Sequence, residues 1–164
     1  MKKTLVVYGS STGTCQAIAD KIGEKLGAET VDVANLTDEQ IAEAENLILG
    51  TSTWGAGELQ DDWYDGVEKL KGADLSAKTV ALFGCGDSES YSDTFCGAMD
   101  EIYAAVADKC AKVVGAVATD DYTFDDSAAV HDGQFVGLAL DDVNEDDKTD
   151  ERIDAWLESI KGEL

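Results

Sequence analysis

The chain has 164 residues, of which 35 are acidic and 12 basic, so its formal net charge at pH 7 is −23. This balance argues against a nucleic-acid-binding protein, because such binding depends on lysine and arginine side chains that neutralise phosphates. The hydrophobic content of 44% argues against a disordered acidic chain. A chain of this length can bury one core, so we expect a single domain over residues 1–164.

The chain lacks the sequence signals of membrane or secretory targeting. No stretch approaches the roughly 20 apolar residues of a membrane span, and the N-terminal MKKTLVVYG leads into a strand without a signal-peptide core. We therefore expect a cytoplasmic protein with no membrane attachment. The four cysteines form no C-x-x-C pair and the single histidine leaves no zinc constellation, so we expect no metal site and reduced thiols.

Apolar runs rich in β-branched residues alternate along the chain with amphipathic segments. The apolar runs predict strands at 4–8, 29–33, 46–52, 78–84 and 112–118. Helical spacing predicts helices at 14–26, 37–44, 61–70 and 93–109, the second of them opened by a capping box at Thr37 and Gln40. Such alternation is typical of right-handed βαβ units. The expected fold class is α/β, a doubly wound five-stranded parallel sheet flanked by helices.

The C-terminal part departs from this alternation. Residues 119–143 are rich in Asp and Gly but include QFVGLAL at 134–140, which predicts a strand. We interpret the segment as an insertion that splits the fifth strand. A last helix is expected to open at 149–151. Trp63 and Trp156 lie in helical patterns and are expected in the core, whereas His131 is expected on the surface.

Three loops are expected at one edge of the sheet, because ligands of doubly wound sheets bind outside the carboxyl ends of the strands. The first loop, 10–15, has neither a Walker lysine nor G-x-G-x-x-G spacing, and no basic residue lies between Lys3 and Lys21. Helix N-terminal amides and hydroxyls can hold a phosphate through neutral donors. The loop therefore favours a phosphate monoester over a nucleoside triphosphate, with a mere capping turn as the alternative.

The second and third loops each bring an aromatic residue. TSTWGAGELQDDW at 51–63 places Trp54 beside two glycines, and GCGDSESYSDTF at 84–95 contains Tyr91. Flat side chains on a flexible backbone suit stacking on a planar ring. Each aromatic alone is also consistent with ordinary packing. Together with the first loop they predict a planar heterocycle with a phosphorylated tail.

These motifs, in this order, resemble those of the flavodoxin family, and specifically its long-chain type. The phosphate motif T/S-x-T-G-x-T is met by Ser10, Thr12 and Gly13, with Cys15 in place of the last threonine. T-W-x-x-G-E-L-Q is met by Thr53, Trp54, Gly57, Glu58, Leu59 and Gln60. G-x-G-D-x-x-x-Y-x-D-x-F is met by Gly84, Gly86, Asp87, Tyr91, Asp93 and Phe95. Residues 120–144 resemble the long-chain insertion, so the resemblance spans nearly the whole chain.

The resemblance implies noncovalent FMN and a low-potential one-electron carrier, not an enzyme, that shuttles between semiquinone and hydroquinone. Trp54 and Tyr91 would sandwich the ring, and the carbonyl of Gly55 would turn toward it. The residues that the resemblance assigns to the cofactor are Ser10, Ser11, Thr12, Gly13, Thr14, Cys15, Ser52, Thr53, Trp54, Gly55, Ala56, Gly57, Gly84, Cys85, Gly86, Asp87, Tyr91 and Phe95. Asp141 and Asp142 are candidates for the rim. Because a thiol donates more weakly than a hydroxyl, Cys15→Thr should tighten FMN unless Cys15 faces the interior.

Residues 120–164 hold 15 acidic and three basic side chains, a net charge of −12. This surface favours a monomer that docks to redox proteins with basic patches, such as a ferredoxin/flavodoxin reductase and low-potential oxidoreductases, with a merely solvated face as the alternative. An FMN-dependent NAD(P)H:quinone oxidoreductase remains the enzymatic alternative, although no basic residue in the three loops would meet a nicotinamide phosphate. A phosphorelay receiver domain would need carboxylates where Ser10, Ser11, Ser52 and Thr53 stand. A flavin-free interaction module is a further alternative.

Overall fold

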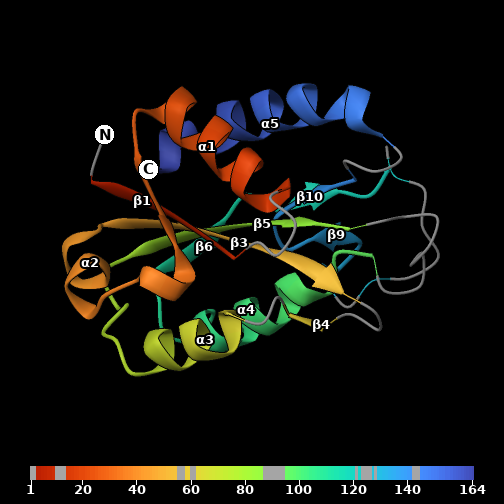
Figure 1. Ribbon diagram of the computed structural model, residues 1–164. Coiled ribbons are helices and arrows are strands. Elements are labelled where there is room, and N and C mark those ends of the chain that lie inside the picture. Colours follow the sequence, from red (N-terminus) through yellow and green to blue (C-terminus); the bar gives the residue numbers. More distant parts are fainter. Residues whose placement is uncertain are drawn as a thin grey trace.

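A parallel sheet forms the centre of the protein in the computed structural model (Figure 1). The structure describes residues 3–9, 14–54, 58–59, 62–86, 95–120, 122, 127, 129–141 and 145–164, with the backbone alone at 14, 52–54, 58–59 and 146. The sheet order is β2 (Glu29–Asp32), β1 (Thr4–Gly9), β3 (Asn46–Trp54), β5 (Thr79–Cys85) and then β10 (Leu138–Leu140). β6 (Lys112–Val114) pairs with the first half of β5 and β10 with its second half. The fifth strand is therefore split, as the sequence predicts.

Helices cover both faces of the sheet, with α1 (Thr14–Leu26) and α5 (Asp146–Ile160) on one face and α3 (Trp63–Lys71) and α4 (Ala98–Val106) on the other (Figure 1). The short α2 (Asp38–Glu43) opens with the expected capping box, in which Thr37 Oγ1 accepts from the Gln40 amide. Two 3-10 helices, η1 (Val33–Asn35) and η2 (Lys161–Glu163), complete the helical elements of the described residues. The doubly wound α/β prediction is confirmed.

Alternation along the central strands builds two cores. Leu47, Leu49 and Leu82 pack beneath α3 and α4, whereas Ile48 and Phe83 pack beneath α1 and α5. A side chain at Gly50 would collide with the Phe83 ring, because its Cβ would lie 2.0 Å from Phe83 Cζ. All seven residues of β5 are buried, as expected of a strand covered on both faces.

The inserted segment forms a second, small sheet together with residues 117–118. Its strand order is β7 (Val117–Ala118), β9 (Gln134–Phe135) and β8 (Val130–His131). Both pairs of neighbouring strands are antiparallel. The predicted strand at 112–118 is thus wrong in one respect. It is broken at Gly115, whose φ of 90° and contact with Trp156 turn the chain out of the main sheet.

Two helix boundaries differ from the sequence predictions. The helix expected from residue 93 begins only at Ala98, because Cys96 has a φ of 52° that no right-handed helix contains. The last helix begins at Asp146, three residues before the expected Thr149, in a polar stretch whose acidic residues favour the positive end of the helix dipole. A short strand β4 (Glu58–Leu59), which the sequence does not predict, pairs antiparallel with the end of β3.

Both helical tryptophans are buried as predicted, Trp63 at 0% and Trp156 at 3% exposure. Within the described ranges, no helix is long and apolar enough to cross a membrane.

Candidate functional site

The strand register brings the three predicted loops to one edge of the sheet. β1, β3 and β5 are neighbours, with Gly9 opposite Thr51 and Thr51 opposite Gly84. The loops that follow these strands therefore start side by side at the carboxyl ends of adjacent strands. This is the switch region where doubly wound sheets bind ligands.

The first loop leads into the positive end of α1. Ser10, Ser11, Thr12 and Gly13 lie outside the described residues, and of Thr14 only the backbone is described. The first turn of α1 holds no acidic residue that would compete with an anion for the helix dipole. The side chain of Cys15 is completely buried, among the apolar residues beneath α1 and α5. The thiol thus faces the interior, and only the backbone of Cys15 remains available to a phosphate.

The second loop is held at both ends by described residues. Thr53 and Trp54 pair with Leu59 and Glu58, so the chain reverses between them. At the far end, Trp63 Nε1 donates to the carbonyl of Gly50 over 2.7 Å and fixes the start of α3 beneath β3. The side chains of Ser52, Thr53 and Trp54 are not described, and Gly55, Ala56 and Gly57 lie outside the described residues.

Both ends of the third loop meet one carbonyl of the insertion. The amide of Gly86 donates to Leu140 O over 2.9 Å, and Cys96 Sγ donates to the same oxygen at 3.7 Å. A Cβ at Gly86 would lie 2.9 Å from the Cys96 amide nitrogen, so only glycine allows this approach. Asp87 and Tyr91, the loop's expected ring contacts, lie outside the described residues.

The described residues that open the third loop, Gly84 and Cys85, are buried. A Cβ on Gly84 would meet Met99 Cγ at 2.7 Å, so this glycine allows α4 to pack closely on β5. The side chain of Cys85 packs beneath α1 and α5 at 6% exposure.

Phe95 is a packing residue in the structure. It is completely buried, and its ring meets those of Phe135 at 5.9 Å and Tyr122 at 6.1 Å between centroids. Tyr122 and Phe135 are themselves 4.9 Å apart, and the Tyr122 hydroxyl donates to Ala139 O over 2.7 Å. The Phe95 side chain, which the family motif assigns to the cofactor site, therefore anchors the loop from beneath.

The insertion thus supplies site-supporting residues that sequence reasoning misses. Tyr122, Phe135 and Leu140 belong to it, and the QFVGLAL pattern marks only that a strand is present. Asp141, expected at the rim, is fully buried, and its carbonyl accepts from the Glu145 amide over 2.9 Å. Asp142 lies outside the described residues.

Two further contacts join the insertion to its surroundings. The Arg152 guanidinium lies 4.0 Å over the Tyr122 ring, and its Nη1 is 3.2 Å from Glu145 Oε1. His131 Nε2 lies 2.7 Å from Asp100 Oδ1 of α4, and its ring meets Tyr103 edge to face. His131 is half exposed, as expected, but it ties β8 to α4.

The thiol of Cys96, beneath the third loop, is neutral. Burial, reinforced by the neighbouring Cys85, holds the pKa of Cys96 well above its ordinary value of 9.0. Cys96 is therefore a protonated donor to Leu140 O over the physiological range. All four cysteines are free.

The residues present fit a phosphorylated flavin. The α1 N-terminus is free of acidic residues, the glycine at position 86 allows close backbone approach, and the three loops contain no lysine or arginine. These features define a doubly wound α/β protein in which β1, β3 and β5 end together beneath loops without basic residues.

Comparison with known proteins gives the family. The flavodoxin family profile matches residues 6–156. Helicobacter pylori flavodoxin is 45% identical over 163 residues, which cover 99% of this chain and 98% of that protein. Azotobacter vinelandii flavodoxin 1 is 40% identical over 171 residues, which cover 100% of this chain and 98% of that protein. The structure of Fusobacterium nucleatum flavodoxin bound to flavin mononucleotide superposes with a TM-score of 0.94 at 35% identity, covering 100% and 99% of the two chains. The chain belongs to the flavodoxin family.

Proposed function

We propose that this protein is an electron carrier that binds FMN noncovalently and passes single electrons between redox enzymes. The observation that carries the proposal is the convergence of the three motif-bearing loops on adjacent parallel strands. Family membership supports it, and the Fusobacterium nucleatum relative is bound to flavin mononucleotide. When bound, FMN supplies two successive one-electron couples.

We assign the phosphate of the cofactor to the first loop. Ser10, Ser11, Thr12 and Thr14 would donate hydroxyl groups, and Gly13 and Cys15 would contribute backbone amides, aided by the dipole of α1. The absence of a cation leaves the charge of the phosphate balanced by neutral donors. No fixed positive charge then stabilises a reduced, anionic ring, which suits a strong donor.

We assign the ring to the second and third loops. Trp54 and Tyr91 would stack on its two faces. Backbone groups of 52–57 and 84–87 would meet its polar edge, and Gly55 would supply a carbonyl that can turn, because glycine tolerates positive φ.

The acidic surface should lower the reduction potential of the second one-electron couple of bound FMN. One carboxylate at about 10 Å with an effective dielectric of about 40 opposes a negative ring by about 0.8 kcal/mol, which is roughly 35 mV for one electron when 59 mV corresponds to about 1.4 kcal/mol. Several such charges would make the lower couple strongly negative. Because salt screens exposed charges, the potential of the lower couple should rise with ionic strength.

The same surface indicates the partners. We propose docking to redox proteins with basic patches, such as a ferredoxin/flavodoxin reductase and low-potential oxidoreductases, by a monomeric cytoplasmic protein. High salt should then slow electron transfer.

A visible spectrum recorded during stepwise reduction tests the proposed function. The purified protein loaded with FMN should pass through the long-wavelength absorbance of a one-electron-reduced flavin. Direct two-electron bleaching, together with NAD(P)H oxidation by the protein alone, would instead identify a reductase. A protein that fails to bind FMN would refute both.

A further inference from the structure

The two described ends of the third loop meet at the carbonyl oxygen of Leu140. The Gly86 amide donates to this oxygen over 2.9 Å, and Cys96 Sγ donates to it at 3.7 Å. Leu140 belongs to β10, which pairs with β5 so that Leu140 lies opposite Cys85, the last residue of β5. The acceptor is therefore fixed to the strand from which the loop departs. We name Gly86, Cys96 and Leu140 the loop anchor.

The backbone of Cys96 is strained. Its φ of 52° lies in the left-handed region, which residues other than glycine seldom adopt. Asp132, with a φ of 55°, is the one other non-glycine residue with positive φ in the described ranges, and it forms with Gly133 a two-residue hairpin turn that favours this conformation. Cys96 instead connects the loop to α4, so the contacts around it must hold its conformation.

Three contacts hold Cys96 in this conformation. Its side chain is completely buried and reaches Leu140 O. Its carbonyl accepts from the Met99 amide over 3.2 Å at the start of α4, and a Cβ on Gly86 would lie 2.9 Å from its amide nitrogen. Met99 packs in turn on Gly84 of β5, where a Cβ would meet Met99 Cγ at 2.7 Å. The exit of the loop is thereby fixed to the same two strands, β5 and β10, as its entry.

A cysteine at position 96 combines two properties that other residues separate. Glycine would adopt a φ of 52° without strain but has no side chain that reaches the Leu140 carbonyl. A larger apolar side chain would fill the buried space but carries no donor. The thiol is both a small apolar group and a weak donor, which suits a contact between the end of a loop and a buried carbonyl.

We propose that Cys96 is a positioning residue for the flavin ring. The third loop carries Tyr91, which we assign to one face of the ring, and the loop anchor fixes both described ends of this loop. Cys96 acts through the loop, because its thiol is completely buried and donates to the Leu140 carbonyl. This role rests on the proposed function, since it requires FMN in the site.

A loosened loop anchor should change both the affinity for FMN and its potentials. Displacement of the loop weakens the stacking of Tyr91 and admits water to the ring. Water solvates the negative charge of the fully reduced ring, so this form loses less affinity than the form before it. The potential of the second one-electron couple therefore rises.

The test measures the dissociation constant of oxidised FMN by fluorescence titration and both one-electron potentials by spectroelectrochemistry. Cys96→Val removes the donor and, as a β-branched residue, opposes positive φ, so FMN should bind about fivefold more weakly. The fully reduced ring should lose about threefold less affinity than the form before it, which raises the second couple by about 28 mV when tenfold corresponds to about 59 mV. Cys96→Ala loses the donor alone and should bind FMN about threefold more weakly. Cys96→Ser keeps a donor and should stay within about twofold.

The FMN-free protein gives an independent readout. Cys96→Val and Cys96→Ala should speed hydrogen exchange of the Gly86 amide about threefold or more, as measured by NMR, because the loop end that shares its acceptor is released. The Thr79 amide, which donates to Glu45 O over 3.1 Å at the amino end of the sheet, should exchange at the wild-type rate.

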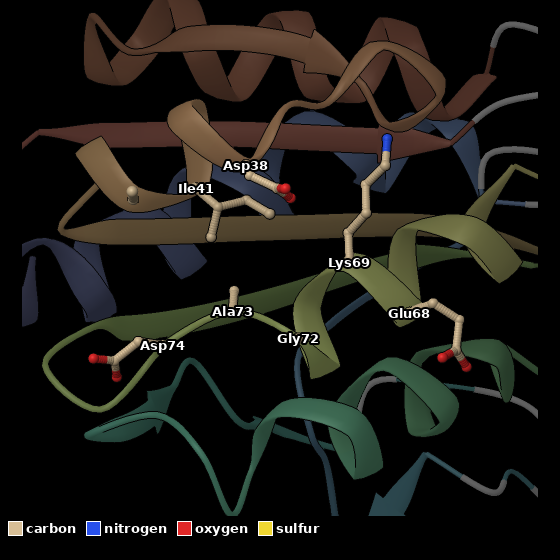
Figure 2. A pocket seen from close by; sticks show the side chains of 8 residues that line it. Asp38, Ile41, Glu68, Lys69, Gly72, Ala73 and Asp74 are labelled. Carbon is tan, nitrogen blue, oxygen red and sulfur yellow. The ribbon is translucent and has the colours of Figure 1, made fainter.

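Ile41→Val is the matched control for a loss of stability alone. Ile41 is 1% exposed and lines the hollow between α2 and α3 (Figure 2), and α2 leads into the amino end of β3. This variant should lower the urea midpoint by an amount similar to Cys96→Ala and leave FMN affinity, both potentials and Gly86 exchange unchanged. If the Cys96 variants change these quantities no more than Ile41→Val does, Cys96 is a packing residue and the inference is overturned.

The outcomes separate the role of Cys96 from the proposed function. Normal FMN binding with unchanged potentials in the Cys96 variants would overturn the positioning role and leave the carrier function intact. A wild-type protein that binds no FMN would refute both. If Cys96→Val does not fold, Cys96→Ala and Cys96→Ser decide through the same measurements.

Discussion

The two ends of the central sheet are stabilised by different chemistry. At the amino end, lysines hold the structure together. Lys78 Nζ donates to the carbonyls of Ala42 and Ala44, Lys109 Nζ to those of Leu70 and Lys71, and Lys3 pairs with Glu43. At the carboxyl end, aromatic rings and the Cys96 thiol contact the insertion, and Lys148 and Arg152 both pair with Glu145 at the start of α5.

This difference explains how an acidic protein keeps its anion site neutral. Helix C-termini point to the amino end of a parallel α/β sheet, and their free carbonyls attract cations. The lysines that cap them are withdrawn from the loops. The carboxyl end is then left for the phosphate that we propose to be bound by amides and hydroxyls, and ring packing of the insertion adds to the Glu145 ion pairs in stabilising this end.

The largest loss of stability is expected when the aromatic packing at the carboxyl end is removed. Phe135→Ala should lower the free energy of unfolding by about 3–4 kcal/mol, because Phe135 is completely buried between Phe95 and Tyr122. Urea denaturation measures this loss. Tyr122→Phe is the control that keeps the ring and removes one hydrogen bond, with an expected loss of about 1 kcal/mol. Equal losses in the two variants would mean that ring packing is not what stabilises this end.

Removing a lysine at the amino end should lower the free energy of unfolding by a smaller amount. Lys78→Met removes the amino group that serves two carbonyls at the end of α2, so we expect a loss of about 2 kcal/mol in the free energy of unfolding. Lys161→Met, at an exposed position after α5, should change it by less than about 0.5 kcal/mol. Similar values for both variants would contradict the structural use of lysine at this end.

The thiol at the carboxyl end predicts a loss of stability in alkali. The folded pKa of Cys96 is raised, so its contribution is complete below the unfolded value near 9.0 and is lost as the pH rises above it. The protein should lose up to about 1.4 kcal/mol per pH unit from this group above that value. Urea denaturation of the reduced protein and of Cys96→Ala at pH 8, 9 and 10 isolates the effect. Parallel pH profiles would remove Cys96 as the cause.

The smallest change in stability is expected from a substitution of Cys15. Because its side chain is buried, Cys15→Thr should cost about 1 kcal/mol of stability for a hydroxyl in an apolar site and leave FMN affinity within about twofold. Fluorescence quenching of added FMN measures the affinity, and Cys15→Ala serves as the control without a hydroxyl. Tighter FMN binding in the threonine variant would show that the group at position 15 does reach the phosphate.

The sequence predicts the sheet and most helices because their signals are local. Helix α1 begins and ends at the predicted residues, and the capping box of α2 is present. The left-handed turn at Cys96 and the chain exit at Gly115 depend on contacts with Leu140 and Trp156, which are distant in the sequence. Such contacts leave no periodic pattern, so the predicted boundaries fail there.

In the candidate site too, local signals could be predicted and contacts between distant residues could not. Motif spacing and strand order place the three loops at one edge, and the register confirms that arrangement. The support beneath the third loop comes from Phe135 and Leu140 of the insertion, which pair with residues 40 or more positions earlier. Burial of Cys15 could not be predicted either, because a residue in the first turn of a helix can face the ligand or the core.

The contact between His131 and α4 also provides a spectroscopic handle. The chain contains one histidine, and it lies at the edge of the Tyr103 ring and 2.7 Å from Asp100. A proton NMR spectrum should therefore hold a single set of imidazole resonances, shifted by the ring current of Tyr103. That one signal reports, without isotope labelling, whether the insertion is seated on the body of the protein when cofactor or partner is added.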